Sequence, residues 1–225
     1  MFNRNPRERI AKVAPWLTLD GDPYPAIIDG KILWIIDGYT TSAGYPNSRV
    51  VNLANTGDAL TSRSNAVSSL DDRNVNYIRN SVKATVDAYD GTVSLYQWDE
   101  KDPVLATWSK AFPGVVQPKS AIPAGVLDHI RYPEDMFRIQ RDILSSYHVD
   151  SAAAFYGGQD FWRVPRDPST FGANAGSQPP YYMTLQMPGA EKPSFSLTTP
   201  FVTRGGRENL SAFAAVNSNA GPDYG

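Results

Sequence analysis

The sequence predicts an α+β fold, because hairpin signals come first, helical signals follow, and strand signals return at the end. Two Asp-Gly pairs, Asp29-Gly30 and Asp90-Gly91, each stand between apolar or alternating runs, a pattern typical of hairpins. A helical period follows Pro133, and alternation returns from Tyr181 onward. With 17 Gly and 18 Pro among 225 residues, we expect a loop-rich chain with a mixed or antiparallel sheet and a few short helices.

The first Asp-Gly pair predicts a two-residue type I′ turn, because glycine tolerates the positive φ that this turn needs. In that register Ile27 faces Ile32, and Pro25 faces Trp34. Both faces of the hairpin are apolar, so we expect its second strand to be buried on both sides. Pro25 places the first strand at an edge of the sheet or at the start of the strand.

The second Asp-Gly pair follows a stretch, residues 82–88, in which Val and Ala alternate with other residues. Strands would place an apolar row on one face and a wetter surface with aromatics on the other. A helix is the alternative, since apolar residues from Val75 to Tyr89 also fit a period of about 3.6 residues. The β-branched content and the turn favour strands. The apolar face would then hold Val82, Val86, Val93 and Leu95, and the wetter face Lys83, Thr85, Asp87, Ser94, Tyr96 and Trp98.

Two longer helices are predicted after the hairpins. Asp102 is a typical N-cap before Pro103, and Pro113-Gly114 ends that helix. Pro133 opens a helix that runs to about Tyr147, with acidic residues in its first turn, where the helix dipole favours them. Its buried side is expected to hold Met136, Phe137, Gln140, Ile143, Leu144 and Tyr147.

The rest of the chain is read from turn residues and alternation. A short helix over residues 151–156 is expected to be capped by Asp150 and stopped by Gly157-Gly158. Residues 165–180 are expected to form a loop, and residues 181–187, 194–200 and 209–216 to form strands. The polar stretch 55–74 is predicted to be the most mobile loop. The whole chain, 1–225, is interpreted as a single domain.

Charge and composition exclude several kinds of protein. The chain has 21 Lys and Arg against 23 Asp and Glu, a net charge of -2, which argues against nucleic acid as a partner. It has no cysteine, which excludes disulfides, thiolate zinc sites and cysteine nucleophiles. No run of about 18 apolar residues predicts a membrane span in this sequence, and its first residues do not resemble a signal peptide.

Acidic residues around the first hairpin are the main candidates for chemistry. Two carboxylates can catalyse glycoside hydrolysis, and oxygen-rich loops can hold calcium. The spacing here fits no twelve-residue calcium loop. Each of these residues also stands next to a glycine or one residue away from it, which is typical of turns. The weak catalytic candidates are Asp20, Asp22 and Asp37, with Asp29 in the same group.

Other constellations are weaker still. His129 and His148 lie near predicted helix ends, no nucleophile elbow is present, and the glycine pairs at 157–158 and 205–206 lack the spacing of a phosphate loop. The sequence therefore predicts no cofactor and no metal site. Four tryptophans could stack on sugar rings, although such residues more often belong to the core. They are Trp34, Trp98, Trp108 and Trp162.

Several longer motifs carry a family resemblance. They are APWLTLDGDPYP (14–25), WIIDGYTTS (34–42), NYIRNSVKA (76–84), DAYDG (87–91), FPG (112–114), HIRYPEDMF (129–137) and RENL (207–210). Together they resemble the uncharacterised protein family 0182, large bacterial membrane proteins known mainly from actinobacteria and cyanobacteria. The resemblance spans almost the whole chain.

The resemblance implies a parent protein with several transmembrane helices followed by a large extracytoplasmic region. This chain would be a fragment of that region, truncated at both ends, on the extracytoplasmic side of the cell membrane. It would be attached to the membrane through the parent's helices, and the basic run Arg4, Arg7, Arg9 and Lys12 would lie near the junction. The family has no assigned reaction, so the resemblance carries no catalytic residue to this chain.

Two functions remain open at this point. The first is a binding or scaffolding module that contacts an envelope component or a protein partner. The second is a hydrolase or transferase of envelope polymers that uses Asp20, Asp22 or Asp37. A cleft with two carboxylates about 5 to 10 Å apart would favour the enzyme. Carboxylates that only cap turns would favour the binding module.

Overall fold

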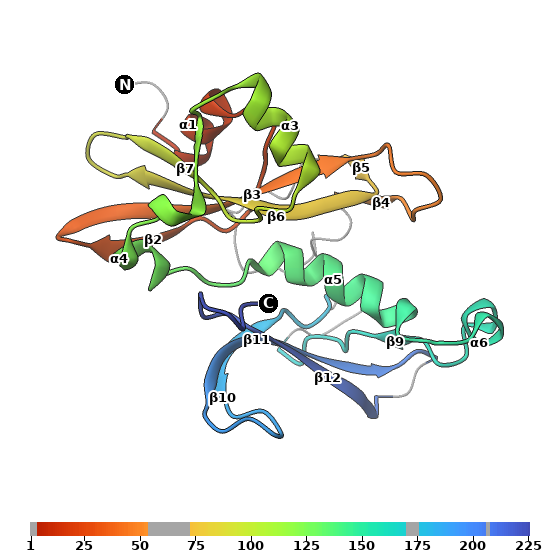
Figure 1. Cartoon of the computed structure of the whole chain (residues 1–225). Helices are drawn as coiled ribbons and strands as arrows, with labels where there is room; N and C mark the ends of the chain where they lie inside the picture. Colours follow the sequence, from red (N-terminus) through yellow and green to blue (C-terminus); the bar gives the residue numbers. More distant parts are fainter. Residues whose placement is uncertain (1–3, 54–72, 170–175, 206–207) are drawn as a thin grey trace. The chain divides into compact units, whose positions relative to one another are not determined.

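The computed structural model describes residues 4–53, 73–169, 176–205 and 208–225. The described residues up to Ile130 form one compact unit, and those from Arg131 onward form a second (Figure 1). Each unit combines a sheet with helices, so the predicted α+β class is confirmed.

The sheet of the first unit is built around two long antiparallel strands, β3 (Lys31–Ser42) and β6 (Tyr77–Asp87). The order across the sheet is β1-β3-β6-β7-β8, and β2 also pairs with β3. The β7–β8 pair is parallel and the other pairs are antiparallel, so the sheet is mixed. The shorter strands are β1 (Thr18–Leu19), β2 (Tyr24–Ile28), β7 (Val93–Gln97) and β8 (Val116–Gln117), and β4 (Val51–Asn52) pairs separately with β5 (Asn74–Val75).

The predicted turn at Asp29-Gly30 is confirmed, with φ of 51° and 75° at its two residues. The register is also as predicted, with Ile27 opposite Ile32. β3 is buried on both sides only from Ile35 to Thr40, whereas Ile27 and Ile32 at the turn are exposed. The prediction of a fully buried strand is wrong at this end, because the turn extends past the helices that cover the sheet (Figure 1).

Helices α1 (Pro6–Val13) and α3 (Pro103–Ala111) cover one face of this sheet (Figure 1). Ile10 and Leu105 from these helices pack with the apolar row predicted on β6 and β7. That row therefore forms the core of the unit, and the strand interpretation of residues 82–95 is confirmed. The buried core is Ile10, Ala14, Leu17, Leu19, Ile36, Val82, Ala84, Val86, Leu95 and Leu105.

The opposite face, predicted to be wetter, is in fact largely buried at Lys83, Thr85, Asp87 and Tyr96. A later segment of the same unit, η1 (Lys119–Ala121) with α4 (Ala124–Leu127), lies on this side, where the Lys119 ammonium lies over the ring of Trp98. It comes so close that a Cβ on Gly125 would lie 2.7 Å from the Cγ2 of Ile28. Alternation along a strand depends only on neighbouring residues. It could not predict that a segment much later in the chain would cover this face of the sheet.

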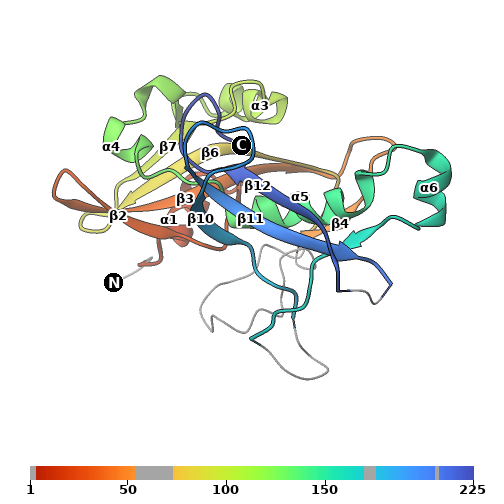
Figure 2. The ribbon, with the colours of Figure 1, turned by 90° about the horizontal axis from the view of Figure 1, so that it is seen from below.

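The second unit begins with α5 (Glu134–Tyr147), which packs against β9 and β11. Its sheet has the order β10-β11-β12, with β9 also paired with β11, and Figure 2 shows the three longer strands side by side. The three predicted strands are therefore confirmed with small shifts of their ends. The remaining elements are α6 (Ala152–Gly157), β9 (Trp162–Arg163), β10 (Tyr181–Leu185), β11 (Ser194–Thr203) and β12 (Leu210–Asn217).

Two helix predictions need correction. Ile143, Leu144 and Tyr147 were expected to be buried on α5 but are exposed, and Gln140 is exposed as well. The helix instead buries Ile139 and Arg141 besides Met136 and Phe137, since the Arg141 guanidinium donates to the carbonyl oxygen of Gln178 at 2.9 Å. The cap of α6 is Ser151 and not Asp150, because the Ser151 hydroxyl accepts from the Ala154 N–H.

Residues 54–72, most of the predicted mobile loop, lie outside the described residues. None of the helices that the structure describes is both long enough and apolar enough to cross a bilayer.

Candidate functional site

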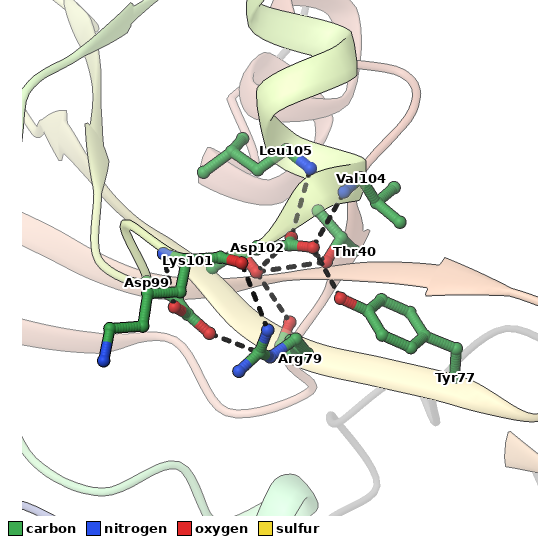
Figure 3. Close-up of polar contacts among 9 residues, drawn as sticks. Thr40, Tyr77, Arg79, Asp99, Lys101, Asp102, Val104 and Leu105 are labelled. Atoms are coloured by element: carbon green, nitrogen blue, oxygen red, sulfur yellow. Dashed lines mark hydrogen bonds and ion pairs between the residues drawn. The ribbon is translucent and has the colours of Figure 1, made fainter.

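A cluster of polar side chains in the first unit surrounds Asp102 (Figure 3). Asp102 is the N-cap of α3, as predicted, and its side chain is buried. The Val104 N–H donates to Oδ1 at 2.9 Å, and the Leu105 N–H donates to Oδ2 at 3.2 Å. These two bonds satisfy N–H groups that have no partner inside the helix.

Three hydroxyl groups from the sheet also donate to the Asp102 carboxylate. Thr40 on β3 and Ser81 on β6 donate to Oδ2 at 2.5 Å and 2.6 Å. Tyr77 on β6 donates to Oδ1 at 2.6 Å. One carboxylate therefore links β3, β6 and the first turn of α3.

The surroundings shift the pKa of two groups in this cluster. Burial alone would raise the pKa of Asp102, but hydrogen bonds from Ser81, Thr40, Tyr77 and the Val104 N–H hold it below its usual value. Burial, and then the hydrogen bond to Asp102, raise the pKa of Tyr77 to about 12. At neutral pH the cluster therefore holds an ionised carboxylate and a neutral phenol.

Arg79 fixes the loop that leads into Asp102 (Figure 3). Its Nε lies 2.9 Å from Oδ2 of Asp99, and its Nη1 donates to the carbonyl oxygen of Lys101 at 3.5 Å. A carboxylate with a low pKa is a poor base for hydroxyl protons. The role that these contacts support is structural: the cluster holds α3 against β3 and β6.

Asp20 lies just after β1 and is buried. Its Oδ2 accepts from the Tyr39 hydroxyl, and its Oδ1 accepts from the Asp22 N–H at 2.8 Å. Asp22 itself is half-buried, in the turn that this bond closes. The Asp20 N–H donates to the carbonyl oxygen of Asp37 at 2.9 Å, so the backbones of these two candidate residues are neighbours.

Asp37 lies in β3 and is also buried. Its Oδ1 accepts from the Lys83 ammonium and from the Asn80 amide, the latter at 2.8 Å. The Tyr39 hydroxyl that bonds to Asp20 comes from β3, whereas Lys83 and Asn80, which bond to Asp37, come from β6. Asp29, the fourth acidic candidate, is the first residue of the hairpin turn.

The two histidines contact backbone carbonyl oxygens. His129 Nδ1 lies 2.7 Å from the Gly125 oxygen. His148 Nδ1 and Nε2 lie 2.8 Å and 2.9 Å from the oxygens of Leu144 and Asp160. Within the described ranges, no three acidic or histidine side chains gather into a group that could hold a metal ion.

The tryptophan rings contact other side chains. Trp108 stacks on Trp16 and Phe112, and Trp162 stacks on His148. Trp98 lies under the ammonium groups of Lys83 and Lys119, and Trp34 packs against the core. These contacts favour the structural interpretation of the four tryptophans over sugar stacking.

Comparison with known proteins identifies the family. The family model described as "Uncharacterised protein family (UPF0182)" matches residues 1–225. The chain belongs to this family. UPF0182 proteins of Thermobifida fusca, Kineococcus radiotolerans and Streptomyces coelicolor are 58%, 55% and 53% identical to it over its whole length. No solved structure matches the chain.

This UPF0182 chain spans about a fifth of each relative, 22%, 23% and 22% of their lengths. The sequence predicted Asp102 as a helix cap, but it did not predict the hydroxyl groups that donate to its carboxylate. Tyr77 and Ser81 lie four residues apart on a strand, and Thr40 lies on another. Only the packing of α3 on the sheet brings them to one carboxylate, and no spacing in the sequence signals that.

Proposed function

We propose that this chain is a non-catalytic binding or scaffolding module on the extracytoplasmic side of the cell membrane, within a larger membrane-anchored UPF0182 protein. The location is the one that the family resemblance implies. The main support for the module is the use of its buried carboxylates. Asp20, Asp37 and Asp102 each accept hydrogen bonds that tie strands or a helix together.

These carboxylates are poorly suited to hydrolysis of envelope polymers. A glycoside hydrolase needs one carboxyl group that stays protonated near neutral pH and a second that faces the substrate. The pKa of Asp102 is instead lowered. Asp20 and Asp37 are almost fully buried, which restricts the access of a polymer chain to either of them.

An exposed apolar surface supports the binding role. In the first unit Ile27 (74%), Tyr89 (85%) and Ile32 are exposed. The Ala88 N–H donates to the Ile32 carbonyl at 2.9 Å, so the end of the β2–β3 hairpin lies next to the end of the β6–β7 hairpin. We call Ile27, Ile32 and Tyr89 the hairpin-tip surface. Two of its three residues are isoleucines, which have no ring face on which a sugar could stack, so we propose a protein partner with a complementary apolar patch.

The test is co-sedimentation of the purified chain with the cell-envelope fraction of Thermobifida fusca. We expect binding that is lost when the fraction is first treated with protease. An Ile27→Lys/Tyr89→Lys variant should bind about tenfold more weakly, as for loss of an interface anchor. The matched control is Phe112→Lys, an exposed apolar position elsewhere in the unit, which should bind like the parent chain.

Three results would overturn this proposal. No binding would remove the partner, binding that survives protease would indicate a polymer or lipid, and equal loss in Phe112→Lys would remove the hairpin-tip surface. The alternative enzyme is tested separately with glycan, peptide and ester substrates. Turnover that disappears in a folded Asp20→Asn or Asp37→Asn variant would establish a carboxylate hydrolase or transferase in its place.

A further inference from the structure

β12 forms one edge of the sheet in the second unit and pairs with β11 on one side. Its sequence, LSAFAAVN, has no charged residue and no proline. Natural edge strands usually carry charges, prolines or bulges that prevent pairing with another chain. Prolines mark two other edge strands, since β2 contains Pro25 and β10 lies between Pro180 and Pro188. In β12 the only such feature is a register shift near Leu210.

The hydrogen-bond pattern shows which backbone groups of β12 face outward. The Ser218 N–H donates to the Phe195 carbonyl at 2.8 Å, just beyond the strand. Because antiparallel ladders alternate, Val216 and Ala214 then bond to β11, and the N–H and C=O groups of Phe213 and Ala215 point away from it. The Asn217 carbonyl also points outward and accepts from the Gly225 N–H at 3.1 Å. Gly225 thus occupies the Asn217 end of the edge, and among the residues that the structure describes no backbone group bonds to the outward N–H and C=O groups of Phe213 and Ala215.

The side chains of β12 are complementary to a second β12 that runs in the opposite direction. If a twofold axis passes through Ala214, Phe213 of each copy faces Ala215 of the other. A large ring then packs over a small methyl group, and the axis repeats this contact. β12 has no charged residue, so no charge faces another charge in this register. Phe213 is 47% exposed, so it has apolar surface to bury.

We propose that two copies of this chain associate through antiparallel pairing of their β12 strands, which joins the two sheets of their second units into one. Phe213 of one copy and Ala215 of the other exchange both backbone hydrogen bonds. The proposal concerns the second unit alone. It therefore stands or fails independently of the partner proposed for the hairpin-tip surface.

The first test measures the mass of the full 225-residue chain by sedimentation velocity between about 1 and 100 μM, a range that detects micromolar affinity. We expect a dimer that forms as concentration rises. Phe213→Lys/Ala215→Lys places like charges opposite each other and should raise the dimer dissociation constant at least about a hundredfold. The matched control, Tyr181→Lys/Met183→Lys, changes two exposed residues on β10 and should dimerise like the parent chain. A monomeric parent chain, or equal dimerisation of both variants, would overturn the proposal.

Hydrogen exchange of single amides distinguishes β12 from any other interface. The amides of Ala214 and Val216, bonded to β11, should be protected at every concentration. The amides of Phe213 and Ala215 should exchange quickly in the monomer and more slowly as the dimer forms. A dimer in which these two amides still exchange quickly would use a different surface, and the proposal would be wrong. Circular dichroism of both variants establishes that they remain folded.

Discussion

Lys83 donates its ammonium hydrogen to Asp37 across two central strands, and the two side chains are 0% and 3% exposed. Removing two charges from water is costly, so such a pair adds little net stability compared with apolar residues of similar size. Loss of one partner, however, removes this counter-charge from the buried group that remains. Asn80 also donates to this carboxylate, which ties the pair into β6.

We therefore expect single substitutions at this pair to be costly. Lys83→Met and Asp37→Leu should each lower the free energy of unfolding by about 3–5 kcal/mol, measured by urea denaturation. The double variant should be more stable than the sum of the two losses predicts, because neither charge of this pair remains in the core. Single variants within about 0.5 kcal/mol of the parent chain would show that the pair is solvated.

The hairpin turn gives a second prediction. Gly30 has a φ of 75°, and a Cβ added there would meet no atom within 4 Å, so any cost of substitution comes from the backbone. Gly30→Val should destabilise the chain by about 1–3 kcal/mol, since a β-branched residue resists positive φ. Gly30→Asn is the control and should cost clearly less, because Asn tolerates this region. Equal melting temperatures for the two variants would contradict the prediction.

The third prediction follows from the corrected burial of α5. Ile139 is buried whereas Leu144 is 39% exposed. Ile139→Ala should cost about 2–5 kcal/mol through lost contacts and a cavity. Leu144→Ala should cost less than about 1 kcal/mol, close to the usual surface range. A reversed order in urea denaturation would mean that the helix is turned about its axis relative to the structure.

Local signals in the sequence predicted much of the fold. The Asp29-Gly30 turn, the Asp102 cap and the start of α5 after Pro133 each depend on residues next to one another, so spacing reveals them. Burial was harder to predict. Lys83 and Arg141 are buried because a distant carboxylate and a distant carbonyl compensate them, and a hydrophobic period counts both as solvent-facing.

The candidate site shows the same limit. Asp20 and Asp37 were selected as acidic residues near turns, and the structure places Asp20 just after β1, with its N–H bonded to the carbonyl oxygen of Asp37 in β3. The Asp102 cluster needs the tertiary packing of a helix on two strands. Its Thr, Ser and Tyr hydroxyl groups have no distinctive spacing in the sequence. The cap could therefore be predicted, but the hydrogen bonds from these hydroxyl groups to Asp102 could not.

The Asp102 cluster predicts a distinct alkaline titration. The pKa of Tyr77, about 12, lies above the ordinary value of about 10. A raised folded-state pKa stabilises the fold fully below pH ~10, and this stability is lost as the pH rises toward ~12. The absorbance difference near 295 nm between the parent chain and Tyr77→Phe should therefore show one phenol that ionises near pH 12. A step near pH 10, with circular dichroism unchanged, would contradict the burial of Tyr77 and its hydrogen bond to Asp102.

The last prediction concerns lipid. The basic run near the N-terminus includes Arg7 and Arg9, and both guanidinium groups bind backbone of their own unit. Arg7 donates to the Leu19 carbonyl at 3.2 Å, and Arg9 donates to the Gly91 carbonyl at 2.9 Å. A basic residue near an anionic surface contributes about 1 kcal/mol to membrane binding. Because Arg7 and Arg9 are held by their own unit, fewer basic side chains can reach the lipid, and the attraction is weaker. We expect no co-sedimentation with phosphatidylserine vesicles at about 0.15 M salt, where charge interactions are screened beyond ~8 Å.

Salt-resistant pelleting with these vesicles would contradict this prediction and would require an apolar contact with lipid. The hairpin-tip surface is then the region to test, because Ile27 and Tyr89 are its most exposed residues. If Ile27→Lys/Tyr89→Lys abolished the pelleting and Phe112→Lys did not, the tip would insert into the bilayer. The proposed protein partner would then be replaced by the membrane itself, because a surface buried among acyl chains is not available to another protein.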